Sequence, residues 1–314
     1  HVSAVNRQNV RDWKHALSKW PLKANDIAAF RGMKFREVLE ANAAEKKPPI
    51  SQKNINRYLS ALGGFAGWLL SNDFIQQDVM RGMYLVLDKR KRTRFPFSAE
   101  QLVSIFGSPM FHRCGGDKKE HKPGDIEIRD WRYWLPVIGL YSGARLGEIA
   151  QLLTADVREI HGVWVFHVTQ EGSDQKSTKT PGSQRVVPIH SKLIELGFLD
   201  YLKSMQEAKS VQLFPELVAD TRGFISGRSS SFFNDYFRRI GAKKDKSVNF
   251  HSLRHGMADA FRRAGYLDEQ FGLLLGHAKH TTTGQYGIIP QGVLADRAAM
   301  VEAVQFPELD GVLC

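Results

Sequence analysis

The sequence predicts a mainly α-helical protein with one small β-hairpin or sheet, arranged as an N-terminal helical domain followed by a C-terminal α+β domain. Three observations predict this fold class. Apolar residues recur at helical spacing in the first 88 residues, a basic run ending in proline follows them, and two β-rich segments lie within an otherwise helical second region. A chain of 314 residues is also too long for one ordinary core.

The first domain is expected to span residues 1–88 and to be all helical. Its clearest helix has Ser51 as a candidate N-cap and continues through apolar residues at i, i+3, i+4 and i+7 spacing: Ile55, Tyr58, Leu59, Leu62, Phe65, Ala66, Leu69 and Leu70. Residues 10–17 and 35–39 mark two earlier helices. The chain starts at His1 without an initiator Met, so we expect it to begin inside a longer protein.

A basic linker is predicted over residues 89–97, between the two periodic regions. Its cations are Lys89, Arg90, Lys91, Arg92 and Arg94, and Pro96 ends the run. Such a segment either lies along DNA phosphates or is a solvated tether, and the sequence leaves both interpretations open.

The second domain is expected to span residues 98–314 and to begin with the capping box Ser98-Ala99-Glu100-Gln101. After a long loop at 107–130, the patterns predict helices at 131–153 (broken at Ser142-Gly143), 193–209, 229–240, 253–264 and 269–275, with strands at 163–168 and 185–189. A tail from residue 301 carries apolar side chains that need burial, either on its own domain or on a neighbouring protomer.

The charge balance favours a polyanionic partner, with nucleic acid first. Lys and Arg total 44 against 33 Asp and Glu, which gives a formal charge of +11 and a pI of about 9.6. Two isolated cysteines, Cys114 and Cys314, indicate a reducing compartment, and no apolar run reaches the roughly 18 residues of a membrane span. His112, Cys114 and His121 have no standard zinc spacing, so no metal site is expected.

Four scattered segments carry the residues that metal-independent cleavage of a phosphodiester requires. They are Ser142–Glu148, Ser177–Thr180, His251–His255 and Leu275–His277, the last followed nine residues after its histidine by Tyr286. Negative charge grows on the non-bridging oxygens in the transition state, and arginine suits them because it stays protonated and binds two oxygens at once. Arg145 and Arg254 are the candidates from distant segments.

The other groups in these segments match the remaining steps of the reaction. A tyrosine can store the phosphate covalently, although its free pKa of about 10 requires nearby cations to favour the phenolate. A lysine on a hairpin loop could protonate the leaving 5′-oxygen, and histidines can bind the phosphate or move a proton.

Together these segments resemble the signature of the tyrosine recombinases, or phage integrases, from about Lys53 to about Gly287. That family has an Arg in a TGxRxxE-like stretch, a Lys on a β-hairpin, HxxR, LGH and a Tyr nine residues after that His, and this sequence has each element in the same order. Departures are Ser142 where Thr is commoner, Gly256 where a hydroxyl residue is usual, and the long 107–130 loop.

The resemblance implies a role for each matching residue. Arg145 and Arg254 would clamp the scissile phosphate, and Tyr286 would attack it to give a 3′-phosphotyrosyl link. In the same scheme, Lys179 would be the general acid for the leaving 5′-hydroxyl, and Glu148 would hold the site together. His251 would assist proton transfer and phosphate binding, and His277 would hydrogen-bond the phosphate. Lys176 lies in the same loop and remains an alternative general acid, although the Lys-Thr pair favours Lys179.

The resemblance also implies partners and a location. The N-terminal part would be a helical core-type DNA-binding domain, and the protein would act on double-stranded DNA as a homotetramer on two sites, without a cofactor. Accessory DNA-bending proteins are candidate partners, and the expected location is the bacterial cytoplasm, at the nucleoid. A type IB topoisomerase, a catalytically silent DNA-binding protein and a metal nuclease are the competing interpretations; the last would need clustered carboxylates, which the sequence does not offer.

Overall fold

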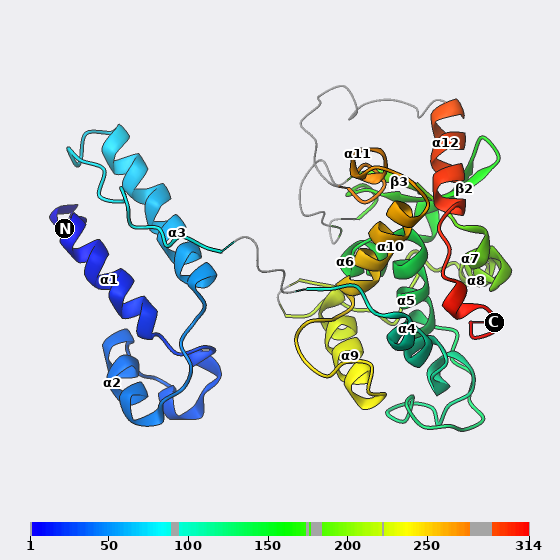
Figure 1. Ribbon diagram of the computed structural model, residues 1–314, viewed down its shortest axis with the longest axis horizontal. Coiled ribbons are helices and arrows are strands. Elements are labelled where there is room, and N and C mark those ends of the chain that lie inside the picture. Colours follow the sequence, from blue (N-terminus) through cyan, green and yellow to red (C-terminus); the bar gives the residue numbers. More distant parts are fainter. Residues whose placement is uncertain are drawn as a thin grey trace. The chain divides into compact units, whose positions relative to one another are not determined.

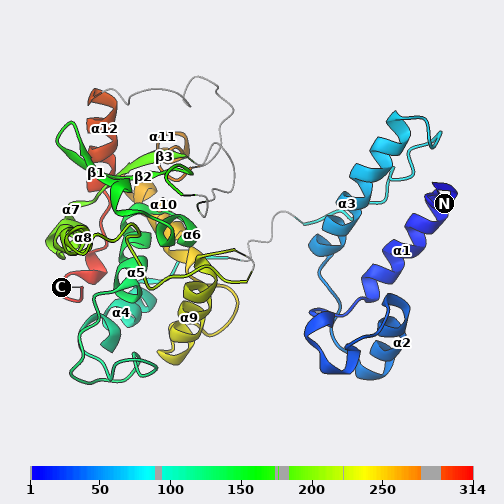
Figure 2. The same ribbon diagram turned by 180° about the vertical axis from the view of Figure 1, so that it is seen from behind.

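The computed structural model describes residues 2–88, 94–173, 176, 184–221, 223–276 and 291–313. The chain divides into two compact units, His1–Lys91 and Arg92–Cys314, and this boundary falls inside the basic run (Figures 1 and 2). Among the predicted functional residues, Lys89, Arg90, Lys91, Arg92, Lys179, His277 and Tyr286 lie outside the described residues.

The first unit is built from three helices and short 3-10 turns: α1 (Arg7–Lys19), α2 (Phe35–Glu45) and α3 (Gln52–Ser71). Helices α1 and α3 lie side by side and share a core in which Val10, Leu17 and Leu59 are buried (Figure 1). The predicted cap of the long helix is confirmed, since the Ser51 side chain accepts a hydrogen bond from the Asn54 N–H at 3.3 Å.

The second unit contains the helices α4 (Ala99–Phe106), α5 (Trp131–Ser142), α6 (Leu146–Ala150), α7 (Ser191–Glu195), α8 (Phe198–Glu207), α9 (Ser226–Arg239), α10 (His251–Arg263), α11 (Asp268–Phe271) and α12 (Gln291–Glu302). Helix α5 is buried on all sides and packs against α10. The predicted capping box at Ser98 and Gln101 is present. The mainly helical fold class with a small sheet is confirmed.

The sheet has three antiparallel strands in the order β1 (Val157–Ile160), β2 (Val163–Val168) and β3 (Arg185–Pro188). The predicted hairpin of β2 and β3 is present, but β1 was missed. It is short, and its two central residues are charged and exposed. His161 and Gly162, with φ of 49° and 79°, make the tight turn between β1 and β2, where the sequence has none of the usual Asn-Gly or Asp-Gly signals.

Side chains alternate between the two faces of this sheet. Val165 of β2 and Val186 of β3 pack with Leu294 of α12 on one face, while Phe166 and Val187 join the main core on the other. Arg185 precedes Val187 by two residues and therefore starts on the core face, an unusual position for a charged side chain.

One predicted helix is two helices in the structure. The sequence pattern predicted a continuous helix over 193–209, whereas α7 ends at Glu195 and α8 begins at Phe198. Gly197 lies between them with φ of +86°, a left-handed conformation that continues neither helix and that glycine adopts without strain.

The C-terminal tail packs on its own domain. Val304, Phe306 and Leu309 are buried in the same core as α5, and the Phe306 ring meets Tyr141 edge-on at 5.4 Å. The His190 ring also makes a hydrogen bond with the Val304 carbonyl at 2.9 Å. Of the two alternatives left open by the sequence, the structure has the tail folded on its own unit.

Candidate active site

Arg145 is positioned by the sharp turn between α5 and α6. Gly143 ends α5 with φ of +61°, and a Cβ atom there would clash with the Leu275 side chain. Only glycine therefore fits the turn and the close approach of the 275 segment together. Arg145 is the N-cap of α6, and a quarter of its side chain remains exposed.

Glu148 is the buried carboxylate on which this site is organised. Its Oε2 atom accepts the backbone N–H of Arg145 at 2.9 Å, and Oε1 accepts the Arg145 guanidinium at 2.5 Å. A second guanidinium, that of Arg185, donates to Oε2 at 2.9 Å. Burial raises the pKa of Glu148, but Arg185 and Arg145 outweigh that effect and hold its pKa at about 2, so the carboxylate is charged at neutral pH.

Arg254 lies on the first turns of α10 and is buried. Its guanidinium donates to the Gly143 carbonyl at 2.8 Å and to the Leu275 carbonyl, so it joins two of the sequence motifs through main-chain oxygen atoms. Burial, and then the positive charges of Arg145 and Arg185, lower its pKa to about 9, which leaves it protonated at neutral pH.

Three successive carbonyl groups accept hydrogen bonds from three different arginines. The Leu274 oxygen accepts from Arg185 at 2.6 Å, the Leu275 oxygen accepts from Arg254, and the Gly276 oxygen accepts from Arg145 at 3.3 Å. This segment ends one residue before His277. The three arginines and Glu148 therefore converge from α6, β3 and α10 on the backbone that leads to the last two predicted catalytic residues.

His251 begins α10, one helical turn before His255, and the two rings meet edge-on with centroids 4.9 Å apart. The His251 residue as a whole is exposed, yet the pKa of its imidazole falls to about 4. The causes are partial burial of the ring and then the charges of His255, Arg254 and Arg145. The imidazole is therefore neutral at pH 7.

The two candidate lysines of the β2–β3 loop differ in what the structure says of them. Lys176 is buried, and its Nζ atom bonds both carboxylate oxygens of Asp156 at 2.8 and 2.9 Å and the Glu171 carbonyl at 2.8 Å. Lys179 lies outside the described residues. Lys176 is thus held in a structural ion pair away from a donor role.

Arg185 is the residue of this cluster that sequence reasoning missed. Two of its donors hold groups of the site, Glu148 and the Leu274 carbonyl, and only 5% of its side chain is exposed. The available signal was weak. An arginine stands on the core face of a strand whose following residues are apolar, where a charge needs a buried partner.

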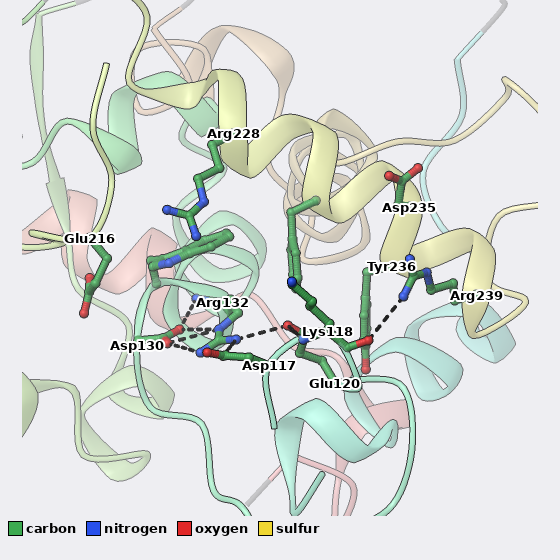
Figure 3. Close-up of a pocket in the computed structure, with 12 residues that line it drawn as sticks. Asp117, Lys118, Glu120, Asp130, Arg132, Glu216, Arg228, Asp235, Tyr236 and Arg239 are labelled. Carbon is green, nitrogen blue, oxygen red and sulfur yellow. Dashed lines mark hydrogen bonds and ion pairs between the residues drawn. The ribbon is translucent and has the colours of Figure 1, made fainter. Parts of the chain in front are cut away.

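A separate cavity of about 440 Å³ lies between the 107–130 loop, the start of α5 and α9 (Figure 3). On one side Arg132 bonds Asp117, Asp130 and Glu120, and Arg228 of α9 lies over the Trp131 ring. The arginine cluster, which we define as Arg145, Arg185, Arg254 and Glu148, does not line this cavity. Its charged groups fix the loop to the helix, and we assign it no part in the chemistry.

Within the described ranges, no group of three or more His, Cys, Asp or Glu side chains is arranged to hold a metal ion. None of the helices in the described parts of the chain has the length and apolar character needed to span a bilayer.

Comparison with known proteins decides the family. The model described as "Phage integrase family" matches residues 128–288, a span that contains all six predicted catalytic residues. The chain belongs to the phage integrase family. The resemblance seen in the motifs is thereby confirmed, and with it the prediction of a tyrosine recombinase, an enzyme of site-specific DNA recombination.

Two tyrosine recombinases align with most of this chain. A tyrosine recombinase of Thermosipho africanus (strain TCF52B) is 25% identical over 289 residues, which are 91% of this chain and 81% of the relative. The tyrosine recombinase XerC of Chlamydia trachomatis serovar L2 is 26% identical over 242 residues, covering 75% and 67%.

Solved structures of integrases share the fold. An integrase of the Tn1549 transposon, in complex with circular intermediate DNA, superposes with a TM-score of 0.55 at 15% sequence identity. The match covers 94% of this chain and 85% of that integrase. At this identity, the likeness shows a common fold.

Proposed function

We propose that this integrase-family enzyme cuts one DNA strand with Tyr286, keeps the phosphate as a 3′-phosphotyrosyl ester, and rejoins it to a different strand. The observation that carries the proposal is the convergence of Arg145 and Arg254, from distant motifs, on the carbonyls that precede His277. A phosphate placed there would meet two fixed guanidinium groups in a partly buried setting, where charge stabilisation is strong.

The two arginines would divide the work of binding the phosphate. Arg145 keeps a quarter of its side chain exposed and would meet the non-bridging oxygens from the open side. Arg254 is buried, and its bonds to two carbonyls use part of a guanidinium that has five N–H donors. Their positive charges would also favour the phenolate of Tyr286 over the phenol.

Proton transfer would be shared among the remaining groups. As the bond from the Tyr286 oxygen to phosphorus forms, the bond to the 5′-oxygen breaks, and Lys179 would give that oxygen its proton. Lys176 is a poor donor because Asp156 holds it. His251, neutral at pH 7, would accept the proton from Tyr286, and His277 would bond a phosphate oxygen.

Rejoining would be the reverse of cleavage, with the 5′-hydroxyl of the partner strand attacking the phosphotyrosyl ester and releasing Tyr286. Each step exchanges one phosphate ester for another, so the bond energy is retained and ATP is not needed. Exchange of the first pair of strands would give a Holliday junction. Arginines neutralise the phosphate in this scheme, so no metal enters it.

The basic linker would lie along the phosphate backbone, and a second segment of the chain extends it. The Phe95 N–H donates to the Ser247 carbonyl at 3.0 Å, which places Arg94 beside the loop after α9. That loop carries three lysines. We call Arg94, Lys243, Lys244 and Lys246 the basic surface, and propose that it contacts DNA phosphates.

The higher-order arrangement follows from the same proposal. The N-terminal unit would be the core-type DNA-binding domain, and four protomers on two DNA sites would supply the four cleavages that full exchange needs. Accessory DNA-bending proteins would assist assembly, and the reaction would take place at the nucleoid, in the bacterial cytoplasm.

The direct test is trapping of a covalent protein–DNA adduct. Purified protein is incubated with a randomised pool of duplexes, each nicked near its centre, and adducts that survive denaturation are isolated and sequenced. A nick placed close to the cleavage point lets the short strand diffuse away and prevents rejoining. We expect wild type to enrich a defined site and Tyr286→Phe to trap nothing.

The competing functions give different results in the same experiment. Adducts without any sequence preference, with relaxation of every supercoiled plasmid, would favour a type IB topoisomerase. DNA binding without adducts on any duplex would favour a catalytically silent DNA-binding protein and would refute the proposal.

A further inference from the structure

Arg185 stands at the start of β3 with its side chain on the core face of the sheet. Its Nη2 atom donates to Glu148 Oε2 at 2.9 Å, and its Nε atom donates to the Leu274 carbonyl at 2.6 Å. The two acceptors belong to different segments, α6 and the turn after α11. One guanidinium thus fixes the distance between them.

The backbone beside this guanidinium admits no side chain. Gly276 has φ of +65°, and a Cβ atom there would lie 2.9 Å from Arg185 Nη1 and 3.2 Å from its Cζ. The positive φ and the close contact with Arg185 therefore explain why glycine occupies this position of the LGH motif. Glycine permits a left-handed turn and lets the Arg185 guanidinium approach the main chain.

From these contacts we propose that Arg185 is a positioning residue for DNA cleavage. It holds Glu148, and through it Arg145, in register with the Leu274–Gly276 backbone that enters the segment carrying His277 and Tyr286. The inference rests on the proposed function, because it assigns Arg185 to the cleavage reaction.

Burial separates this role from phosphate binding. Only 5% of the Arg185 side chain is exposed, against 25% for Arg145, which shares the same carboxylate. A phosphate in contact with Arg145 would therefore meet Arg185 only indirectly. Arg185 acts through the groups that it holds.

The geometry also predicts that lysine cannot replace Arg185. The Nε and Nη2 atoms donate in one plane to two acceptors on different segments, and a lysine ammonium has neither the fork nor the planarity. Arg185→Lys keeps the positive charge but cannot make the hydrogen bonds to Glu148 and to the Leu274 carbonyl at the same time. Displacements of about 1 Å at a reacting centre can slow a reaction on the order of 100-fold.

The test uses the full chain and the site recovered by adduct trapping. Arg185→Lys, Arg185→Met and Gly276→Ala are compared with wild type for DNA affinity and for the rate of adduct formation at saturating protein, and each variant's fold is checked by thermal melting. Arg158→Lys is the matched control, since Arg158 also lies in this sheet but is exposed and bonds the half-buried His167 ring.

We expect Arg185→Lys to slow adduct formation by about 10- to 100-fold with affinity little changed. Gly276→Ala should do the same, and Arg158→Lys should match wild type. The pH profile adds a readout that a general loss of packing would not move. Arg185→Met removes the charge beside Glu148 and should shift the acid limb of the rate to higher pH, while Arg185→Lys should leave that limb in place.

Three outcomes would overturn the inference. They are a wild-type rate in folded Arg185→Lys, a loss of affinity as large as the loss of rate, and an equal loss in Arg158→Lys. Failure of the proposed function is distinguishable, because wild-type protein would then form no adduct at all.

Discussion

At the scale of single residues, Glu148 shows how opposing effects set the charge of a buried group. Burial alone would favour its neutral form, yet two guanidinium groups and a backbone N–H keep it ionised. A carboxylate of this kind has few substitutes. A neutral group would leave Arg145 and Arg185 without their shared counter-charge inside the protein.

Glu148→Gln should therefore destabilise the fold at pH 7, by about 3 kcal/mol for a broken buried ion pair. Because the folded-state pKa is lowered to about 2, the stabilisation is present above the ordinary carboxylate value and is lost as the pH falls toward 2. Urea unfolding at pH 7 and pH 3 should show the wild type and variant converging at the lower pH.

Glu195→Gln is the control for that measurement, because Glu195 pairs with Lys192 on the surface and is 67% exposed. Its unfolding should match wild type at both pH values. A Glu148→Gln deficit that stays the same at pH 3 would contradict the assignment.

The sequence anticipated part of this cluster, and the missing part has a physical explanation. Arg145, Glu148 and Arg254 lie in motifs whose spacing can be recognised, and the structure brings them together. Arg185 has no such local pattern, since the carbonyl that it binds belongs to Leu274, 89 residues further along the chain. The partner of a single buried charge is a tertiary property that periodicity does not report.

At the scale of elements, the β2–β3 loop carries two lysines that the sequence left as alternatives. Lys176 makes an ion pair with Asp156, which lies in the short turn before β1, and both side chains are buried. A group that is held by a carboxylate inside the protein serves stability, and this supports the proposal that Lys179 is the proton donor.

Lys179→Ala should slow adduct formation by about 100- to 1,000-fold, as expected for loss of a general acid. The rate should recover on a duplex with a bridging 5′-phosphorothiolate, because a thiolate leaves without protonation. Lys176→Met should instead lower the free energy of unfolding by about 3 kcal/mol and leave the rate of the folded protein unchanged. Recovery of Lys176→Met on the sulfur substrate would reverse the assignment.

The basic surface can be tested through the salt dependence of DNA binding. Lys244 and Lys246 are exposed, and each phosphate contact contributes about one unit to the slope of log K against log salt. Lys244→Ala with Lys246→Ala should reduce that slope by about two and weaken binding to all sequences alike.

The matched control for this surface is the double variant Lys203→Ala and Lys209→Ala, two exposed lysines within α8 and just after it. It removes the same charge elsewhere and should leave the slope nearly unchanged. Equal slopes for both double variants would show that net charge alone matters.

Most elements followed from local patterns, whereas strand β1, helix α12 and the break at Gly197 were missed. Caps at Ser51 and Ser98 were predictable because N-cap chemistry is local. Strand β1 was missed because its two central residues are both charged, so the sequence shows no alternation of apolar and polar residues there. Its hydrogen-bonded pairing with β2 is a tertiary contact that the sequence pattern does not report. The break at Gly197 was missed because an isolated glycine is often tolerated within a helix.

At the scale of the whole molecule, the C-terminal tail completes the core of the second unit. Phe306 packs on Tyr141 of α5, and Val304 is tied to His190 before α7. The tail thus contributes to the core of its own protomer.

Phe306→Ala should lower the free energy of unfolding by about 3–5 kcal/mol, the usual cost of emptying a buried phenylalanine site. Phe224→Ala is the control, because that side chain is 54% exposed. Thermal and urea unfolding measure both. Normal stability in Phe306→Ala, together with altered sedimentation on DNA, would indicate that the tail packs on a neighbouring protomer.

The division of the chain into two units also has a sequence origin. The periodic apolar pattern stops before Lys89 and resumes after Ser98, so each unit can close its own core and the basic run between them need not be buried. The roles of the two units on DNA remain predictions. The motifs predicted to be catalytic all fall in the second unit.

The close contacts of Gly143 and Gly276 bear on how this sequence can diverge. Arg254 donates to the Gly143 carbonyl, and Arg185 lies where a Cβ atom of residue 276 would be. The effects of substitutions at an arginine and at the glycine that it contacts are therefore expected to depend on each other. A Cβ atom at position 276 would displace Arg185, and one at position 143 would displace Leu275 and Met257, so a change at either glycine requires a change in the side chains that surround it.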